Sequence, residues 1–363
     1  GQSGGPTAAI NSSLAGVYRT AKDRGANKVY GMLHGIQGLL QERYLDLSEY
    51  ITTELDAELL KRTPAAFLGS CRFKLPEIHE DKGVYEKIFS ILDKLDIEAF
   101  IYIGGNDSMD TIKKLSDYAI VTGHPTRFIG CPKTIDNDLA LTDHTPGYGS
   151  AAKYIGTSVK EIIRDSFCLE YNKGLVSIVE IMGRNAGWLT GAAALAKGED
   201  CEGPDLIYLP EIPFDLHAFS DKVKELLSRK PSVVVAVSEG IRTADGTYVC
   251  ELGSSIDFVD AFGHKQLSGT ASYLASFIAG EIGCKTRAIE LSSLQRSASH
   301  AASRVDILEA YQVGGAAVKA ADEGDSGKMV VLQRLSDDPY QCGTEVKDVH
   351  KIANDEKLVP REW

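Results

Sequence analysis

Short apolar segments that run into small and polar residues recur along the chain. Ile101-Tyr102-Ile103 leads into Gly104-Gly105-Asn106-Asp107-Ser108, and Phe128-Ile129 leads into a polar stretch at 132–138. Each apolar segment is predicted as a short buried strand, and residues 109–118 between them as a helix. Because parallel strands joined by a helix lie in one sheet, their polar ends should meet at its carboxyl edge. Open α/β sheets bind ligands at this edge.

The same alternation continues through the rest of the chain and predicts an α/β fold. The predicted helices are 8–22, 49–60, 84–95, 150–167, 188–196, 217–228, 270–283 and 305–321. The predicted strands are 28–32, 99–103, 175–181, 205–209, 232–237, 287–291 and 328–334. The stretch 242–268 is predicted as a loop.

The length of 363 residues favours two domains, because one hydrophobic core rarely supports so long a chain. We expect two doubly wound (Rossmann-like) α/β domains. The first is expected to comprise 1–147 plus 295–345, and the second 148–294 plus 346–363. The chain opens on a glycine loop, which needs a strand before it, so we also expect that a few residues precede Gly1.

Composition and net charge exclude some classes of function. The net charge of −12 argues against general binding of nucleic acid or of acidic membranes, and it requires any phosphate site to be positive locally. Seven cysteines without CxxC or Cys/His metal spacing fit a reducing cytoplasm. No apolar run approaches the length of a membrane span, and no signal peptide is visible. We therefore expect a cytoplasmic protein that acts on small molecules.

Two kinds of polar cluster carry candidate chemistry. Gly4-Gly5 and Gly104-Gly105 each precede a predicted helix, where backbone N–H groups and the helix dipole suit a phosphate; a plain strand–helix turn is the alternative. Asp136 and Asp138 are alternate residues and point the same way in extended chain. One is a candidate general base and the other a candidate to orient a metal or water, and the alternative is an Asx-rich turn.

Six motifs in order carry a family resemblance. They are Gly1-Gln2-Ser3-Gly4-Gly5-Pro6-Thr7, Gly104-Gly105-Asn106-Asp107-Ser108, Pro132-Lys133-Thr134-Ile135-Asp136-Asn137-Asp138, Gly147-Tyr148-Gly149-Ser150-Ala151-Ala152-Lys153, Met182-Gly183-Arg184 and Leu294-Gln295-Arg296. Together they resemble the phosphofructokinase family, and more closely its pyrophosphate-dependent branch. The resemblance implies a first domain that binds pyrophosphate and a second that binds fructose 6-phosphate, with the active site in the cleft between them. It also implies reversible formation of fructose 1,6-bisphosphate in glycolysis or gluconeogenesis, with Mg²⁺, by a homodimer or homotetramer.

The resemblance assigns roles residue by residue. Asp136 matches the base that takes the proton from the sugar C1 hydroxyl, which typically contributes ~10²–10⁴-fold to the rate. Thr134 and Asp138 flank it, and Asp138 is also a candidate metal ligand. The donor site is assigned to Gly4, Gly5, Arg72 and Gly105, and the sugar-phosphate site to Thr134, Ile135, Asp136, Met182, Gly183, Arg184, Glu239, Arg287, Ser293 and Arg296.

Two residues indicate pyrophosphate as the donor. Asp107 stands where ATP-dependent relatives have glycine, beside the expected place of the α-phosphate of ATP. Two unit charges ~4 Å apart at an effective dielectric near 20 repel by about 4 kcal/mol, roughly a thousandfold in binding. Lys133 also stands where ATP users commonly have glycine, and its ammonium group can stabilise a leaving phosphate.

Some positions depart from the family pattern. Asn106 replaces the magnesium-binding aspartate; an amide oxygen is a poorer Mg²⁺ ligand than a carboxylate, but Asn106 remains a candidate ligand. Ser293 replaces a histidine common in ATP-dependent enzymes. Gly174 and Leu175 stand where relatives can carry an arginine that reaches the neighbouring subunit's substrate, and Lys173 is a candidate substitute.

Three alternatives stay open at this point. An ATP-dependent 6-phosphofructokinase is the nearest. A non-catalytic regulatory subunit of the same fold is disfavoured because the candidate base Asp136 is present with Arg184, Glu239 and Arg287. A nicotinamide-dependent oxidoreductase is disfavoured because the first glycine loop lacks the spacing G-x-G-x-x-G.

Overall fold

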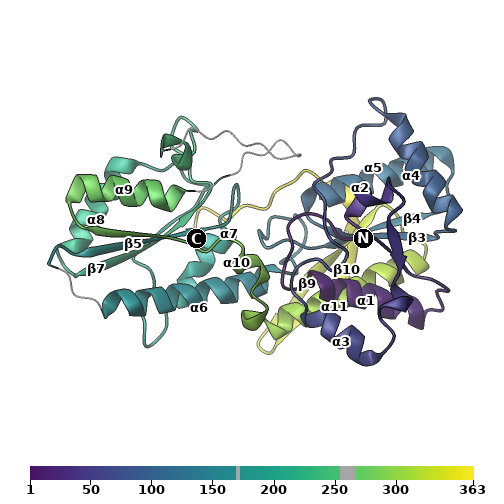
Figure 1. Cartoon of the computed structure of the whole chain (residues 1–363), viewed down its shortest axis with the longest axis horizontal. Helices are drawn as coiled ribbons and strands as arrows, with labels where there is room; N and C mark the ends of the chain where they lie inside the picture. The colour runs from purple at the N-terminus through teal and green to yellow at the C-terminus, as the bar shows by residue number, and fades with distance from the viewer. Residues whose placement is uncertain (169–171, 254–266, 268) are drawn as a thin grey trace. The chain divides into compact units, whose positions relative to one another are not determined.

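The computed structural model describes residues 1–168, 172–253, 267 and 269–363 (Figure 1). The chain forms two compact units. The first comprises Gly1–Ser150 and Arg296–Glu356, and the second comprises Ala151–Gln295 and Lys357–Trp363. Residues 254–266 and 268 of the predicted 242–268 loop lie outside the described residues.

The first unit is built on a sheet with the strand order β10-β9-β4-β3. Strand β3 (Ala99–Gly104) is parallel to β4 (Arg127–Pro132), and β4 is parallel to β9 (Lys328–Asp337). Gln2 forms a parallel bridge with Ile103, so the first residues of the chain lie along the free side of β3. The predicted strand–helix–strand unit is therefore present, with α5 (Asn106–Thr122) as its helix.

Alternating side chains of this sheet enter two separate cores, because successive residues of a strand point to opposite faces. Phe100, Phe128 and Met329 pack on one face, with α4 (Lys82–Lys94) and α5. Ile103, Ile129 and Val330 pack on the other, with α1 (Ile10–Asp23) and α11 (Arg304–Asp322). Figure 1 shows these helix pairs on either side of the strands, as expected for a doubly wound domain.

Glycines let α1 and α11 approach each other closely. A Cβ atom on Gly16 would lie 2.1 Å from the carbonyl oxygen of Tyr311, and one on Gly314 would lie 2.1 Å from that of Ser13. A side chain at either position would force the helices apart. The close packing fixes α1, whose N-terminus follows the first glycine loop.

Strand β10 (Tyr340–Asp348) was not predicted from the sequence. It pairs antiparallel with β9 at the edge of the sheet, and its side chains are mostly exposed or half-buried. Because it faces water, it lacks an apolar run. Residues 346–356, expected in the second domain, lie in the first unit, and 346–348 end this strand.

The second unit contains a parallel sheet with the strand order β6-β7-β5-β8. The strands are β6 (Leu206–Tyr208), β7 (Ser232–Ser238), β5 (Leu175–Ile181) and β8 (Lys285–Glu290), and the helices are α6 (Tyr148–Phe167), α7 (Trp188–Gly191), α8 (Leu216–Leu227), α9 (Thr270–Ile282) and α10 (Leu294–Ser297). Helices α6 and α10 begin or end across the unit boundary. Valines of β5 and β7 pack against α8 and α9. The alternation of strands and helices predicted this α/β arrangement correctly.

The first unit has further α-helices and strands. They are α2 (Gly35–Leu39), α3 (Glu54–Arg62) and an antiparallel pair of short strands, β1 (Tyr30–Met32) and β2 (Tyr44–Asp46). The predicted strand 28–32 thus forms a small antiparallel pair instead of joining a parallel sheet. No helix in the described part of the chain is long and apolar enough to cross a bilayer.

Candidate active site

The carboxyl ends of β3 and β4 bring the two polar clusters of the first unit together. Gly104 and Pro132 are register partners, and the N–H of Lys133 donates to the carbonyl of Gly104 at 2.9 Å. A Cβ atom on Gly105 would lie 3.8 Å from the Cβ of Thr134. The two clusters therefore lie side by side, as the strand–helix–strand pattern predicted.

The first glycine loop lies against the same edge. The N–H of Ser3 donates to the carbonyl of Ile103 at 2.9 Å, which continues the sheet up to the loop. Gly4 follows with a φ of 75°, a value that favours glycine. The ammonium group of Lys133 then donates to the carbonyl of Gly5 at 2.8 Å. Lys133 thus joins the first loop to the β4 cluster.

Lys133 is buried, with 3% of its surface exposed. Burial lowers its pKa to about 8, the charges of Asp136 and Asp138 act to raise it, and those of Arg296 and Arg72 lower it further. These four side chains are therefore charged neighbours of the Lys133 ammonium group. Three cationic side chains and two carboxylates therefore surround the glycine loops, which provides the local positive charge that an acidic protein needs for a phosphate site.

The two carboxylates interact with each other. Burial raises the pKa of Asp138 to about 7, and the neighbouring charges of Asp136 and Glu356 raise it as well, while Lys133 opposes them. A carboxyl group such as Asp138 that titrates near neutrality can accept a proton and release it again. The sequence did not predict that Glu356 lies near these carboxylates, because the fold alone brings it close to Asp138.

Hydrogen bonds hold the segment that carries these carboxylates. The hydroxyl of Thr145 donates to the carbonyl of Thr134 at 2.7 Å, and the N–H of Asp136 donates to the hydroxyl of Thr134 at 3.1 Å. The side chain of Asn137, whose φ is 55°, accepts the N–H of Thr145 at 3.0 Å. The turn expected from Asx residues is thus made by Asn137, between the two candidate functional aspartates.

His144 anchors the same loop to α11. Its imidazole nitrogens lie 2.7 Å from a carboxylate oxygen of Asp143 and 2.7 Å from one of Glu309. Burial lowers the pKa of His144, but the bonds to Glu309 and Asp143 outweigh this effect and the pKa is raised. Nearby, the carboxylate of Asp306 accepts the N–H groups of Gly147 and Ser150 at 2.8 and 3.0 Å.

The candidate metal ligands differ in their surroundings. The amide oxygen of Asn106 accepts the N–H of Asn354 at 2.6 Å, and the amide nitrogen donates to the carbonyl of Asp355 at 2.8 Å. Asp107 is exposed in the first turn of α5. Among the described residues, no group of three or more histidine, cysteine, aspartate or glutamate side chains is arranged around a metal position.

Arg296 lies in the first unit, although the resemblance assigned it to the sugar-phosphate site. A Cβ atom on Gly5 would lie 3.5 Å from its Nη1 atom, and its charge acts on Lys133. Its guanidinium group therefore lies beside the first glycine loop, with the residues assigned to the donor.

The second unit gathers another group at the carboxyl ends of β5 and β7. The N–H of Met182 donates to the side chain of Gln295 at 3.0 Å, and that of Gly183 donates to Glu239 at 3.4 Å. Gly240 packs so closely that a Cβ atom there would lie 2.0 Å from the carbonyl oxygen of Arg184. The Met-Gly-Arg motif and Glu239 are thus brought together.

Arg287 lies away from that group. It pairs in register with Ser177, five residues before Met182, which corresponds to about 16 Å along a strand. Its guanidinium group pairs with Asp165 at 2.8 Å. Ser293 lies beyond the end of β8 and is exposed. Arg287 is close in register to Leu175, at the end of the sheet opposite the Met-Gly-Arg motif.

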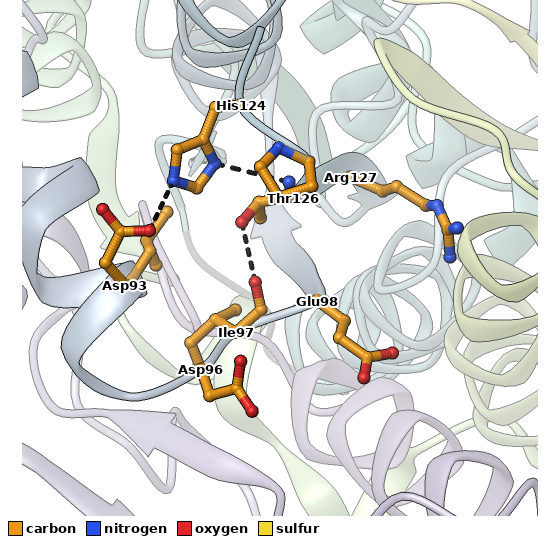
Figure 2. Close-up of a pocket in the computed structure, with 9 residues that line it drawn as sticks. Asp93, Asp96, Ile97, Glu98, His124, Thr126 and Arg127 are labelled. Carbon is orange, nitrogen blue, oxygen red and sulfur yellow. Dashed lines mark hydrogen bonds and ion pairs between the residues drawn. The ribbon is translucent and has the colours of Figure 1, made fainter.

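A small cavity of about 210 Å³ lies at the opposite edge of the first unit's sheet (Figure 2). Its lining residues Glu98 and Thr126 directly precede β3 and β4. Nε2 of His124 lies 2.9 Å from a carboxylate oxygen of Asp93, and Asp96 adds a third carboxylate to the lining. Its acidic side chains do not suit a phosphate, so this cavity is separate from the candidate site.

One parallel sheet and one sheet that is parallel except for β10 each carry glycine and charged residues at the carboxyl ends of their parallel strands. Together they define a doubly wound α/β protein with the features of a phosphate-binding class. The family model described as phosphofructokinase matches residues 1–321. The chain therefore belongs to the phosphofructokinase family.

Particular relatives are similar over nearly the whole chain. The pyrophosphate–fructose 6-phosphate 1-phosphotransferase of Xanthomonas campestris pv. campestris (strain B100) is 44% identical, over 99% of this chain and 84% of the relative. The crystal structure of a pyrophosphate-dependent phosphofructokinase from Nitrosospira multiformis aligns with a TM-score of 0.87 and 35% identity, over 99% of this chain and 85% of that one. The ATP-dependent 6-phosphofructokinase 2 of Streptomyces coelicolor (strain ATCC BAA-471 / A3(2) / M145) is 32% identical, over 97% of this chain and 96% of the relative.

Proposed function

We propose that the protein is a pyrophosphate-dependent fructose 6-phosphate phosphotransferase. The observation that carries the proposal is the position of Lys133, buried between the first glycine loop and the carboxylates, with Asp107 on the neighbouring helix turn. The printed names of relatives more than 40% identical support the same donor and acceptor. The reaction is reversible and serves glycolysis or gluconeogenesis.

In the forward step, the C1 hydroxyl oxygen of fructose 6-phosphate attacks a phosphorus atom of pyrophosphate. The bridging P–O bond breaks, phosphate leaves, and the hydroxyl proton passes to Asp136. Lys133, Arg72 and Arg296 stabilise the charge on the pyrophosphate oxygens, together with the N–H groups of the glycine loops. The first unit is thus proposed to bind the donor, and the Met182–Arg184 motif with Glu239 to bind the sugar phosphate.

Magnesium fits this arrangement as a cofactor. Mg²⁺ usually takes one or two protein carboxylates together with substrate phosphates and water, so a cluster of three protein ligands is not required. Asp138, with Asp136 beside it, would hold the ion, which when bound neutralises charge on the pyrophosphate. The cytoplasmic location and the homodimer or homotetramer remain predictions; all seven cysteines are free thiols, which fits a reducing compartment.

The test is a coupled assay with fructose 6-phosphate and Mg²⁺ that compares pyrophosphate with ATP at equal concentrations. We expect turnover with pyrophosphate and much less with ATP. Turnover with ATP alone would mean that the donor assignment is wrong. Binding of fructose 6-phosphate without turnover on either donor would indicate a regulatory subunit.

A further inference from the structure

The C-terminal part of the first unit is attached to the first turns of α5 by three hydrogen bonds. The N–H of Asn354 donates to the amide oxygen of Asn106 at 2.6 Å, and the amide nitrogen of Asn106 donates to the carbonyl of Asp355 at 2.8 Å. The side chain of Asn354 donates to Asp110 at 3.0 Å. Asn106 and Asp110 are one helical turn apart, so they present these groups on one face.

The chemistry of this attachment requires an amide at residue 106. One end of the Asn106 side chain accepts a backbone N–H, and the other end donates to a backbone carbonyl. An aspartate has the same shape but offers only acceptors when ionised. In an Asn106→Asp variant, a carboxylate oxygen would face the carbonyl oxygen of Asp355 at the 2.8 Å now spanned by a hydrogen bond.

The attached segment also reaches the loop that carries the candidate carboxylates. Glu356 forms an antiparallel bridge with Leu139, which directly follows Asp138. On the other side, Asp107 directly follows Asn106 in the first turn of α5. Residues 354–356 therefore connect the two chain positions next to Asp107 and Asp138, after which the chain enters the second unit.

We propose that Asn106 is a positioning residue that clips residues 354–356 between α5 and the loop after Asp138. The clip holds Asp107 and Asp138 in a fixed relation at the donor site. This explains why an amide stands where the resemblance expects a magnesium-binding aspartate. The kinetic part of the proposal rests on the proposed function, whereas the structural part does not.

The alternative role as a metal ligand predicts the opposite order of variants. A carboxylate is a better Mg²⁺ ligand than an amide, so a ligand at this position would be preserved or improved in Asn106→Asp and lost in Asn106→Ala. The hydrogen bonds of the clip, in contrast, are lost in both Asn106→Asp and Asn106→Ala. The aspartate variant therefore separates the two roles.

The first measurement is hydrogen–deuterium exchange of residues 350–360 in the wild type, Asn106→Asp and Asn106→Ala. We expect exchange about two- to tenfold faster in both variants, since each loses hydrogen bonds worth that factor. Asn354→Gly should give a smaller increase, because it retains the backbone bond and tolerates the φ of 65° at this residue. Asn27→Asp, an exposed asparagine elsewhere, adds the same charge and should leave exchange unchanged.

The second measurement is kinetic. With pyrophosphate, we expect both Asn106 variants to lower kcat/KM by about two- to tenfold with no lower Mg²⁺ requirement, and Asn27→Asp to be unchanged. Wild-type exchange in Asn106→Asp, or wild-type turnover of that variant at lower Mg²⁺, would overturn the clip. If the wild type itself has no turnover, the proposed function fails, and the exchange experiment still decides whether the clip exists.

Discussion

The exposed position of Asp107 leads to a quantitative prediction about donor choice. If its carboxylate repels the α-phosphate of ATP, then Asp107→Asn, which removes the charge and preserves the shape, should improve ATP relative to pyrophosphate. At ~4 Å, two unit charges repel by about 4 kcal/mol at a dielectric near 20, but by about 1 kcal/mol in bulk water. Because Asp107 is exposed, the value should lie toward the lower end.

We therefore expect a repulsion of about 1–2 kcal/mol, not the 4 kcal/mol that a partly buried pair would give. This corresponds to roughly a five- to thirtyfold change in the ratio of kcat/KM for pyrophosphate to kcat/KM for ATP. Exposed charges are screened by salt, since the Debye length is about 3 Å at 1 M. The ratios of the wild type and the variant should therefore converge as the salt concentration rises.

The assay is the coupled reaction with fructose 6-phosphate and Mg²⁺, run with each donor over a series of salt concentrations. Glu98→Gln is the matched control, because it removes an exposed carboxylate at the opposite edge of the same sheet (Figure 2). Loss of an acidic residue from the first turn of α5 also costs about 0.3–1 kcal/mol of stability, which is measured separately by thermal unfolding. An unchanged donor ratio in Asp107→Asn would refute the electrostatic explanation.

Two further predictions concern the segment that carries the carboxylates. Asp136→Asn should lower kcat by about 10²–10⁴-fold while the thermal midpoint stays close to that of the wild type; a variant with wild-type kcat would exclude Asp136 as the base. The raised pKa of His144 means that its protonation stabilises the fold below its ordinary pKa of about 6.5, and that this stability is lost as the pH rises through the raised value. The stability advantage of the wild type over His144→Gln, from urea unfolding, should thus be largest below about pH 6.5 and shrink as the pH rises above it; a constant difference would contradict it.

The elements that position the first unit's site were predictable from the sequence. Strands β3 and β4 are short runs of mostly apolar, buried residues. Each is followed by small or polar residues whose presence the packing of an apolar core does not explain. The parallel strand–helix–strand connection then determines that both ends meet at one edge. The adjacency of Gly105 and Thr134 is therefore what the strand–helix–strand pattern of the sequence predicts.

Contacts between segments that are distant in sequence were not predictable in the same way. Strand β10 is exposed and lacks an apolar run, and the residues after it join the site only because β10 returns the chain along the sheet. Asn106 and Asn354 are 248 residues apart, and each alone is an ordinary polar residue. The resemblance drew attention to Asn106 as a departure, but only the hydrogen bonds suggest what the amide does.

The arginines illustrate a second limit of motif reasoning. The resemblance assigns both Arg287 and Arg296 to the sugar phosphate. In the structure, Arg296 lies beside Gly5 in the first unit, and Arg287 lies within β8 of the second unit. A motif states which residue types recur, whereas register and the unit boundary decide which atoms meet. The two arginines lie nine residues apart in the sequence but belong to different units, so their shared role at the sugar phosphate stays a prediction.

The cations near the glycine loops explain how a protein with a net charge of −12 can bind a polyanion. Lys133 is buried, and burial lowers its pKa to about 8. Without a bound anion, its ammonium group is therefore a charge that water solvates poorly. A bound pyrophosphate would stabilise the charged form, because an opposite charge within a few ångströms raises the pKa of a lysine. The attraction between the two charges then offsets the cost of desolvating the ammonium group. Pyrophosphate binding should therefore be accompanied by proton uptake near pH 8 and by little uptake well below it. Asp107 is exposed, and we predict that it adds selectivity against ATP without cancelling this attraction.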